Sequence, residues 1–212
     1  MSTTNSSSQV RSLVEQALKH LADCIASDVL FRYLSAREAT QTYPHVFQKY
    51  DLFFGVVIGA VFESLVLSLH KLLEDGGKHA TAPPVNIRRI LRLAEQDGFL
   101  DKAMYRSLKA RIDAVVPIWK KVDHLRNNLV AHSRENLSVE AELSEAGLTS
   151  SQWRKLIQTY AIILNKLAFS LEIAMLDVRA REKNFAQNVT MLLDALDEIE
   201  QGRNYMKRGI SD

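Results

Sequence analysis

Cysteine, glycine and proline are all scarce in this sequence, and each shortage excludes a class of fold. The single cysteine, Cys24, rules out a framework of internal disulfides and is typical of a reducing cytoplasm. It stands among apolar neighbours, so we expect a buried thiol rather than a reactive one. Eight glycines and four prolines in 212 residues are too few for a turn-rich β architecture and favour long helices.

A strong charge of one sign and a long apolar run are also missing. The net charge of +2 is too small to attract nucleic acid by itself, so any RNA affinity must come from local charge placement. The first residues lack the basic start and apolar core of a secretory signal. The longest apolar run, Leu52 to Phe62, is about half of what a bilayer span needs and ends at Glu63. We therefore expect a cytoplasmic protein with no membrane partner.

The sequence also lacks the patterns of common metal and cofactor sites. It contains no His-Glu-x-x-His motif, no Glu-x-x-His pair and no cysteine cluster. Gly76-Gly77 has neither the preceding strand nor the Lys and Ser/Thr of a phosphate-binding loop. His70 and His79 flank this loop, where they would bind a metal only by accident. We predict neither a metal nor a cofactor.

Apolar residues recur at steps of three and four along nearly the whole chain, which predicts an all-α fold. We expect an antiparallel bundle of long helices. The first helix is predicted from about Gln9 to Ala39, and Tyr43-Pro44 breaks the helical path because the residue before proline is pushed out of the helical region. The residues expected on its inward face are Val10, Leu13, Val14, Ala17, Leu18, Leu21, Ile25, Val29 and Tyr33.

The middle of the chain is expected to hold three helices. The second helix, Val46 to Asp75, is apolar almost all round in its first half, so we expect that half to be the most buried element. A short basic helix then spans Asn86 to Gln96. Asp101 can cap the next helix, which reaches about Arg134 and is expected to kink at Pro117.

The last third begins with an acidic stretch, Asn136 to Gly147, that we expect to be irregular. Thr149 and Gln152 form a capping box that opens a helix toward Val178. A final amphipathic helix is predicted from about Lys183 to Gln201. We predict a single domain over residues 1–212, with a core at about 45–180 and the first and last helices as extensions.

The segment from Arg126 to His132, Arg-Asn-Asn-Leu-Val-Ala-His, carries the chemistry of the chain. It places a cation, two amides and an imidazole within about two helical turns. Arginine stays charged and its planar fork fits phosphate oxygens two at a time. Histidine, with an ordinary pKa of about 6.5, exchanges protons at neutral pH. Such a set can hold and cleave an RNA phosphodiester without a metal.

The polar residues of the segment can each take a role in that reaction. His132 can take the proton of the ribose 2′-hydroxyl or protonate the leaving 5′-oxygen. Arg126 can neutralise the charge that builds on the phosphorus centre. Asn127 or Asn128 can fix the imidazole tautomer or bind a phosphate oxygen. The product would carry a 2′,3′-cyclic phosphate, and DNA, without that hydroxyl, would not be cut.

These residues resemble the motif of the HEPN superfamily (higher eukaryotes and prokaryotes nucleotide-binding domains). Its endoribonuclease members carry Arg, a polar residue, three to five further residues and His, which Arg126, Asn127 and His132 match in order. The order of a long helix, a loop, a short helix and a motif helix ending in Ala-His is similar to the branch associated with abortive phage infection. The resemblance covers about residues 45–180. It implies a dimeric helical bundle, metal-independent RNA cleavage and use as a toxin or phage-defence effector, with a possible antitoxin or regulatory protein as partner.

Helical geometry favours a homodimeric site. Arg126 and His132 lie about 9 Å apart along a helix axis and about 120° apart around it, so they do not converge on one phosphate by themselves. A two-fold interface between facing helices would supply two copies of each group to one groove. A surface ion pair between Asp123 and Arg126, with His132 at the helix end, is the structural alternative.

Three further residues are secondary candidates for the site. His124 and Asn128 share a face with His132 at steps of four, although a solvated helix position is the favoured interpretation of His124. Glu63 interrupts an apolar helix, and HEPN proteins often hold an acidic residue on the helix before the motif. The alternative for Glu63 is an ordinary place on the edge of the helix.

Two other functions stay open beside an endoribonuclease. One is a non-catalytic HEPN-like module that binds RNA, nucleotide or a partner protein, and the other is a structural bundle with a chance motif. A basic rim could track an RNA backbone, although such residues are usually solvated helix faces. Its members are Arg88, Arg89, Arg92, Arg106, Lys109 and Arg111.

Overall fold

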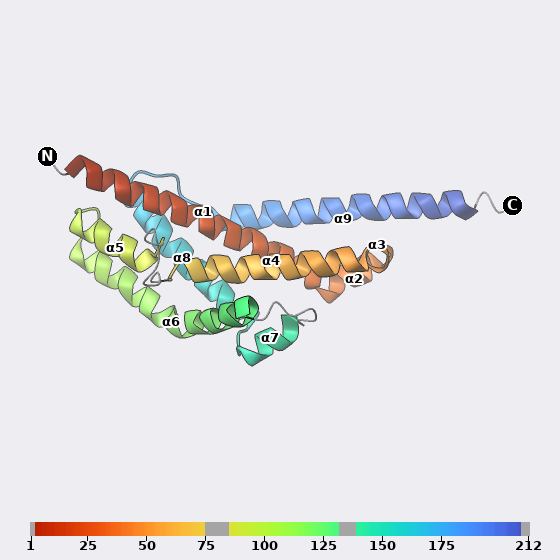
Figure 1. Ribbon diagram of the computed structural model, residues 1–212. Coiled ribbons are helices and arrows are strands. Elements are labelled where there is room, and N and C mark those ends of the chain that lie inside the picture. Colours follow the sequence, from red (N-terminus) through yellow and green to blue (C-terminus); the bar gives the residue numbers. More distant parts are fainter. Residues whose placement is uncertain (1–2, 75–84, 132–138, 209–212) are drawn as a thin grey trace. The chain divides into compact units, whose positions relative to one another are not determined.

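The computed structural model describes residues 3–74, 85–131 and 139–208 of the chain. Within these ranges every regular element is an α-helix (Figure 1), which confirms the all-α prediction. The helices are α1 (Thr3–Ser35), α2 (Arg37–Thr42), α3 (Pro44–Lys49), α4 (Asp51–Lys71), α5 (Ile87–Gln96), α6 (Lys102–Ala131), α7 (Val139–Glu145), α8 (Ser150–Ser170) and α9 (Val178–Arg208).

The chain forms two compact units, and each is described by itself. The first unit comprises Met1–Ile25 and Glu63–Val178, and the second comprises Ala26–Phe62 and Arg179–Asp212. Helices α1 and α4 therefore contribute residues to both units. The single domain expected from the sequence stays a prediction.

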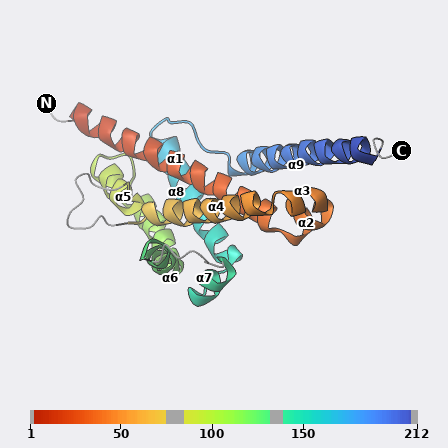
Figure 2. The same cartoon turned by 45° about the vertical axis from the view of Figure 1, so that its right-hand side comes forward.

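The core of the first unit forms where α6 packs against α8 and where α5 packs against both (Figure 2). Helix α8 buries a wide apolar face because its large side chains recur at steps of three and four. Helix α6 contributes Leu108, Ile112, Val122 and Leu125, each at most 2% exposed. The buried residues of α8 are Trp153, Leu156, Ile157, Tyr160, Ala161, Ile163, Leu164, Leu167 and Ala168.

Side-chain caps fix the beginnings of the helices in this unit. The side-chain oxygen of Asn86 accepts hydrogen bonds from the backbone N–H groups of Arg88 and Arg89, as an N-cap does. Its amide nitrogen donates to the carbonyls of Leu73 and Glu74, at 3.1 and 2.8 Å. Asn86 therefore joins the end of α4 to the start of α5.

The caps predicted for α6 and α8 are confirmed. Asp101 Oδ1 accepts from the N–H of Met104 at 2.7 Å, and Gln152 Oε1 accepts from the N–H of Thr149 at 3.1 Å. Helix α6 continues through Pro117 and bends along its length in Figure 1, as expected for an internal proline. The described part of α6 ends at Ala131.

The second unit has a small apolar core and several polar ties between its segments. Its core consists of Leu34, Val46, Phe54, Val189 and Leu193, with partly buried neighbours around them. The polar ties connect the α2–α4 region to α9. They are the hydrogen bond from Tyr43 Oη to Asp194 Oδ1 (2.6 Å), that from Tyr50 Oη to Glu200 Oε1 (2.8 Å), and the ion pair of Lys49 with Glu200.

The first predicted helix is divided in the structure. Ala36 has an extended backbone (φ −70°, ψ 133°) between α1 and α2. The hydroxyl of Ser35 donates to the carbonyl of Phe31, a local bond that competes with regular helix geometry. Tyr33, expected on the inward face, is 38% exposed. The break at Tyr43-Pro44 is confirmed, because Pro44 is the first residue of α3.

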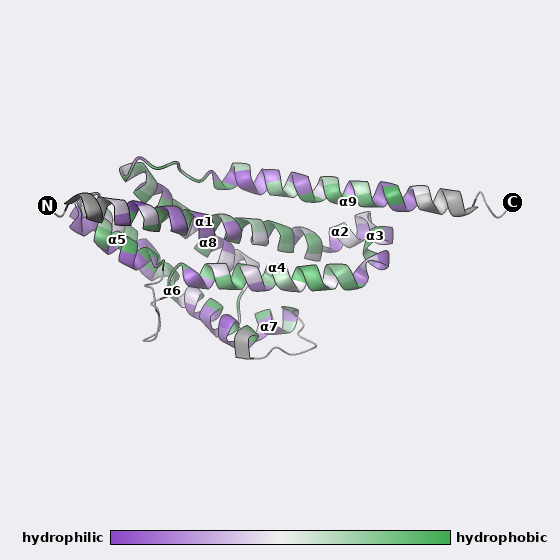
Figure 3. Ribbon diagram, turned by 45° about the horizontal axis from the view of Figure 1, so that its top comes forward, coloured by the Kyte–Doolittle hydropathy of each residue, from purple (hydrophilic) through white to green (hydrophobic). Residues whose placement is uncertain are grey.

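The prediction that the first half of the apolar helix is the most buried element is wrong. Leu52 is 87% exposed, Phe53 60% and Val56 72%, whereas Phe54 is buried in the small core. Only one side of this half-helix faces the second unit's core, and the sequence is apolar on the other sides as well. Figure 3 accordingly shows the half of α4 next to α3 as mostly hydrophobic, whereas its other half carries hydrophilic bands.

Helix α4 is long and apolar enough to cross a membrane, judged by length and composition only. The uninterrupted apolar run Leu52 to Phe62 is only part of this helix, so the sequence-based expectation underestimated its apolar length. Core helices of soluble proteins can be equally long and apolar, and a third of the apolar stretch of α4 is buried in the protein, including Leu65, Val66 and Leu69. The absence of a membrane partner stays a prediction.

Three other boundaries differ from the predicted ones. Residues Val139–Glu145, expected to be irregular, form α7. Helix α8 stops at Ser170, and Glu172 has a left-handed backbone (φ 54°), so the predicted continuation to Val178 does not occur. Helix α9 is longer than predicted at both ends. The predicted end of the second helix at Gly76-Gly77 lies outside the described residues.

Candidate functional site

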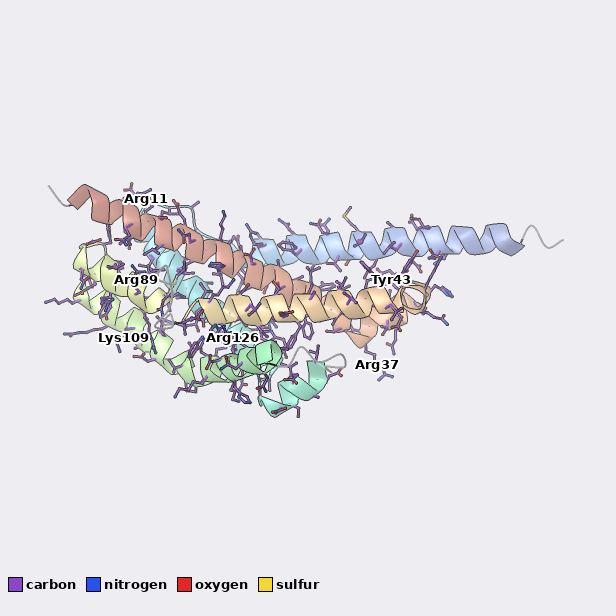
Figure 4. The ribbon with its side chains drawn as sticks, viewed as in Figure 1. Arg11, Arg37, Tyr43, Arg89, Lys109 and Arg126 are labelled. Carbon is purple, nitrogen blue, oxygen red and sulfur yellow. The ribbon has the colours of Figure 1, made fainter. Side chains whose placement is uncertain are left out.

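The last turns of α6 carry most of the predicted site residues. Val122 and Leu125 are fully buried and fix the rotation of the helix about its axis. Consequently Arg126 lies half-buried at the edge of the core (Figure 4), and Asn127 is exposed. His132, the predicted acid–base residue, lies outside the described residues.

The guanidinium of Arg126 has unused hydrogen-bonding capacity. Its Nη1 donates to Oδ1 of the adjacent Asn127 at 2.9 Å. Its Nε is buried, and no atom of the described residues accepts a hydrogen bond from it. Because a buried N–H without a partner is costly, this group favours an acceptor from outside the described parts of the chain. A phosphate oxygen is an acceptor of suitable charge and geometry.

The ion pair between Asp123 and Arg126, the structural alternative for the motif, does not form within the described residues. Asp123 Oδ1 instead lies 2.9 Å from Nε2 of His70, a residue of α4. The opposite ring nitrogen, Nδ1, lies 3.6 Å from Oε2 of Glu74. His70 thus has a carboxylate beside each nitrogen of its ring.

Contacts with Trp119 hold the His70 ring in place. The two rings stack with centroids 5.5 Å apart and planes inclined by 20°. The indole N–H of Trp119 also donates to the carbonyl oxygen of His70 at 3.3 Å. The side chain of His70 is only 6% exposed, whereas that of Asp123 is 39% exposed. The pair therefore reaches from the buried interior to the surface of α6.

Helical spacing puts this pair next to the motif. Trp119, Asp123 and Arg126 follow one another at steps of four and three, so they share one face of α6. From the sequence, His70 was expected only to flank the adjacent loop with His79. The available signal was a histidine within the apolar sequence Leu65–Leu73, where a buried ring needs a polar partner.

The secondary candidates are less closely connected to Arg126. Glu63 and His124 are exposed and Asn128 is half-buried. In the described parts of the chain, none of the three makes a hydrogen bond or ion pair with Arg126. They stay predictions, as does the role of Asn127 toward His132.

The basic rim is partly neutralised by an acidic residue. Asp113 Oδ2 lies 2.7 Å from Lys109 Nζ, and its Oδ1 lies 3.4 Å from Arg88 Nη2. The hydrogen bond from Lys109 is the main reason why the pKa of Asp113 is lowered, and the charge of Arg88 adds to it. Exposed pairs of this kind contribute little stability, but they reduce the charge available to a polyanion.

No group of three or more His, Cys, Asp or Glu that could hold a metal ion occurs in the part of the chain that the structure describes. A surface hollow in the second unit is lined by Arg32, Tyr33, Tyr43 and Leu193 among others. It contains none of the predicted site residues. The chemistry that the motif can perform therefore depends on the end of α6 in the first unit.

Comparison with protein families identifies the family of the chain. The model described as HEPN_AbiU2, AbiU2, matches residues 8–184, a range that includes the candidate site. No curated protein and no solved structure matches the chain.

Proposed function

The chain belongs to the AbiU2 family of HEPN domains, and from this premise we propose that it is a metal-independent endoribonuclease acting in abortive phage infection. The observation that carries the proposal is that, among the described residues, the guanidinium of Arg126 makes no ion pair and donates only to the neutral amide of Asn127, while Asp123 binds His70. A cation kept ready at the end of the motif helix is what a phosphodiester substrate requires.

The proposed reaction is a transesterification in which all atoms come from the RNA itself. The ribose 2′-oxygen attacks the adjacent phosphorus, and the bond from phosphorus to the 5′-oxygen breaks. His132 accepts the proton of the 2′-hydroxyl or donates one to the leaving 5′-oxygen. The products are a 2′,3′-cyclic phosphate and a free 5′-hydroxyl.

Arg126 would bind the non-bridging phosphate oxygens and stabilise the charge that grows on them. The hydrogen bond from its Nη1 to Asn127 supports a more specific role for that amide. By accepting from one edge of the guanidinium, Asn127 would orient it, while its own NH₂ group can still donate to the substrate. Asn127 would thus orient Arg126, in addition to the contact with His132 or phosphate predicted from the sequence.

A homodimer is part of the proposal. The wide angle between positions 126 and 132 on one helix favours a groove in which each phosphate meets Arg126 of one subunit and His132 of the other. The exposed side chains of Leu52, Phe53 and Val56 favour an additional protein contact, such as an antitoxin or other regulatory protein. We expect the protein to act in the cytoplasm.

The test is cleavage of single-stranded RNA by the purified protein in EDTA. Arg126→Ala and His132→Ala should each lower the cleavage rate by about 10²–10⁴-fold, the range for a lost charge stabiliser or acid–base group. Arg154→Ala and His45→Ala change the same residue types at exposed positions and should cleave like the wild type. RNA binding without cleavage by the wild type would instead support a non-catalytic binding module.

A further inference from the structure

Asp123 stands where it would be expected to neutralise Arg126. The two residues are three positions apart on α6, a spacing at which a carboxylate and a guanidinium readily meet on a helix surface. An Arg126 paired in this way would have fewer N–H groups left for a phosphate, and the nearby carboxylate would repel the substrate. A site that uses Arg126 therefore has to keep Asp123 occupied elsewhere.

His70 supplies the alternative partner. Its Nε2 lies 2.9 Å from Asp123 Oδ1, a normal hydrogen-bond distance. The ring is buried against Trp119, which also binds the carbonyl oxygen of His70, so its position is fixed from two sides. Asp123 is the more exposed member of the pair. Without His70, its carboxylate would be free to turn toward solvent or toward Arg126.

The state of Arg126 agrees with this arrangement. Its single described hydrogen bond is to the neutral amide of Asn127, and its buried Nε has no acceptor among the described residues. Among the described residues, Arg126 and Asp123 therefore do not form the surface ion pair that their spacing allows, because the carboxylate binds His70. The arrangement keeps positive charge available on this face of α6.

We infer that His70 is a positioning residue that holds the carboxylate of Asp123 away from Arg126, so that the guanidinium stays free to bind a phosphate. This inference rests on the proposed function in so far as the phosphate belongs to RNA. It assigns His70 no contact with substrate. The role is electrostatic and acts through Asp123.

The inference makes a prediction that a merely structural His70–Asp123 bond does not. In His70→Leu the released carboxylate should turn to Arg126, and affinity for RNA should fall by about tenfold or more. Asp123→Asn removes the anion that could compete for Arg126, so this variant should bind the RNA at least as well as the wild type. The double variant His70→Leu/Asp123→Asn should regain the affinity of Asp123→Asn, because no carboxylate is left to compete.

Binding is measured by fluorescence anisotropy with a 2′-O-methyl RNA, which the proposed reaction cannot cleave. Arg126→Ala is included to confirm that the measured affinity depends on the guanidinium. A double variant as weak as His70→Leu would overturn the inference, because the bond would then matter only for packing. Wild-type binding that is independent of Arg126 would overturn it as well.

Loss of folding in His70→Leu is controlled with His70→Gln. The glutamine amide can still donate to Asp123, so this variant should retain more affinity than His70→Leu at equal thermal stability. If the wild type binds the methylated RNA but cleaves no RNA, the nuclease proposal fails while the order of affinities still tests His70. If the wild type cleaves RNA and all the His70 and Asp123 variants bind RNA with equal affinity, only the inference fails.

Discussion

The two units use apolar side chains differently. In the first unit, leucine, isoleucine and aromatic side chains of α6 and α8 pack in a core where many of them are fully buried. In the second unit, the core is small, and Leu52, Phe53 and Val56 are exposed on α4, a helix that is more apolar than α6 or α8. An apolar sequence therefore does not by itself determine which side chains are buried.

Polar contacts show the complementary difference. The second unit is joined by Tyr43 with Asp194 and by Lys49 and Tyr50 with the buried carboxylate of Glu200. In the first unit, the most buried polar group beside the motif is His70, whose contacts involve the candidate site. The buried polar groups of the second unit thus hold its segments together, whereas the buried His70 of the first unit lies next to the candidate site.

The largest expected effect comes from a cavity in the first unit. Leu164→Ala removes most of a fully buried side chain of α8 and should lower the free energy of unfolding by about 2–5 kcal/mol. Ile162→Ala, on the same helix at a residue 44% exposed, should cost less than about 1 kcal/mol. Urea unfolding followed by circular dichroism measures both. Equal losses would contradict the packing assigned to α8.

A smaller effect is expected when a polar tie of the second unit is broken. Lys49→Met leaves the buried carboxylate of Glu200 without its lysine and should cost about 1–3 kcal/mol. Lys155→Met, at an exposed position of α8, serves as the matched control and should be nearly neutral. Hydrogen exchange should report the loss mainly in α9. Unchanged exchange there would show that the tie does not contribute to cohesion.

The smallest expected effect concerns Tyr43 and depends on pH. The hydrogen bond to Asp194 is the main reason why the pKa of Tyr43 is raised to about 12. A raised pKa in the folded state means that the contribution to stability is complete below the unfolded value of about 10. It is lost as the pH rises toward 12.

Tyr43→Phe should therefore lower stability by at most about 1 kcal/mol near neutral pH, since the bond is exposed. The difference from the wild type should shrink between pH 10 and 12. Urea midpoints at a series of pH values measure it, with absorbance at 295 nm following the phenol. A difference that does not change over this range would argue against the bond.

Periodicity and capping residues predicted much of the fold. The spacing of apolar residues located most of the helices, and Asp101 and the Thr149–Gln152 box marked two helix starts. The exposure of Leu52 was not predictable, because hydropathy reports the character of a side chain and not the number of its neighbours. Helix α7 was missed because its acidic sequence lacks an apolar stripe.

The candidate site was predictable only for contacts between residues that are close in sequence. Arg126 and Asn127 are adjacent in sequence, so their proximity follows from the motif. The contact of His70 with Asp123 joins residues 53 positions apart on two helices, and periodicity carries no information about such a pairing. That Asp123 binds His70 and not Arg126, among the described residues, likewise depends on contacts in three dimensions.

Cleavage of a DNA oligonucleotide that contains one ribonucleotide tests the central claim most directly. In EDTA the wild type should cut only after the ribonucleotide and leave a 2′,3′-cyclic phosphate there, and His132→Ala and Arg126→Ala should not cut. Cutting of the all-DNA strand, or undiminished cutting by either variant, would contradict the account.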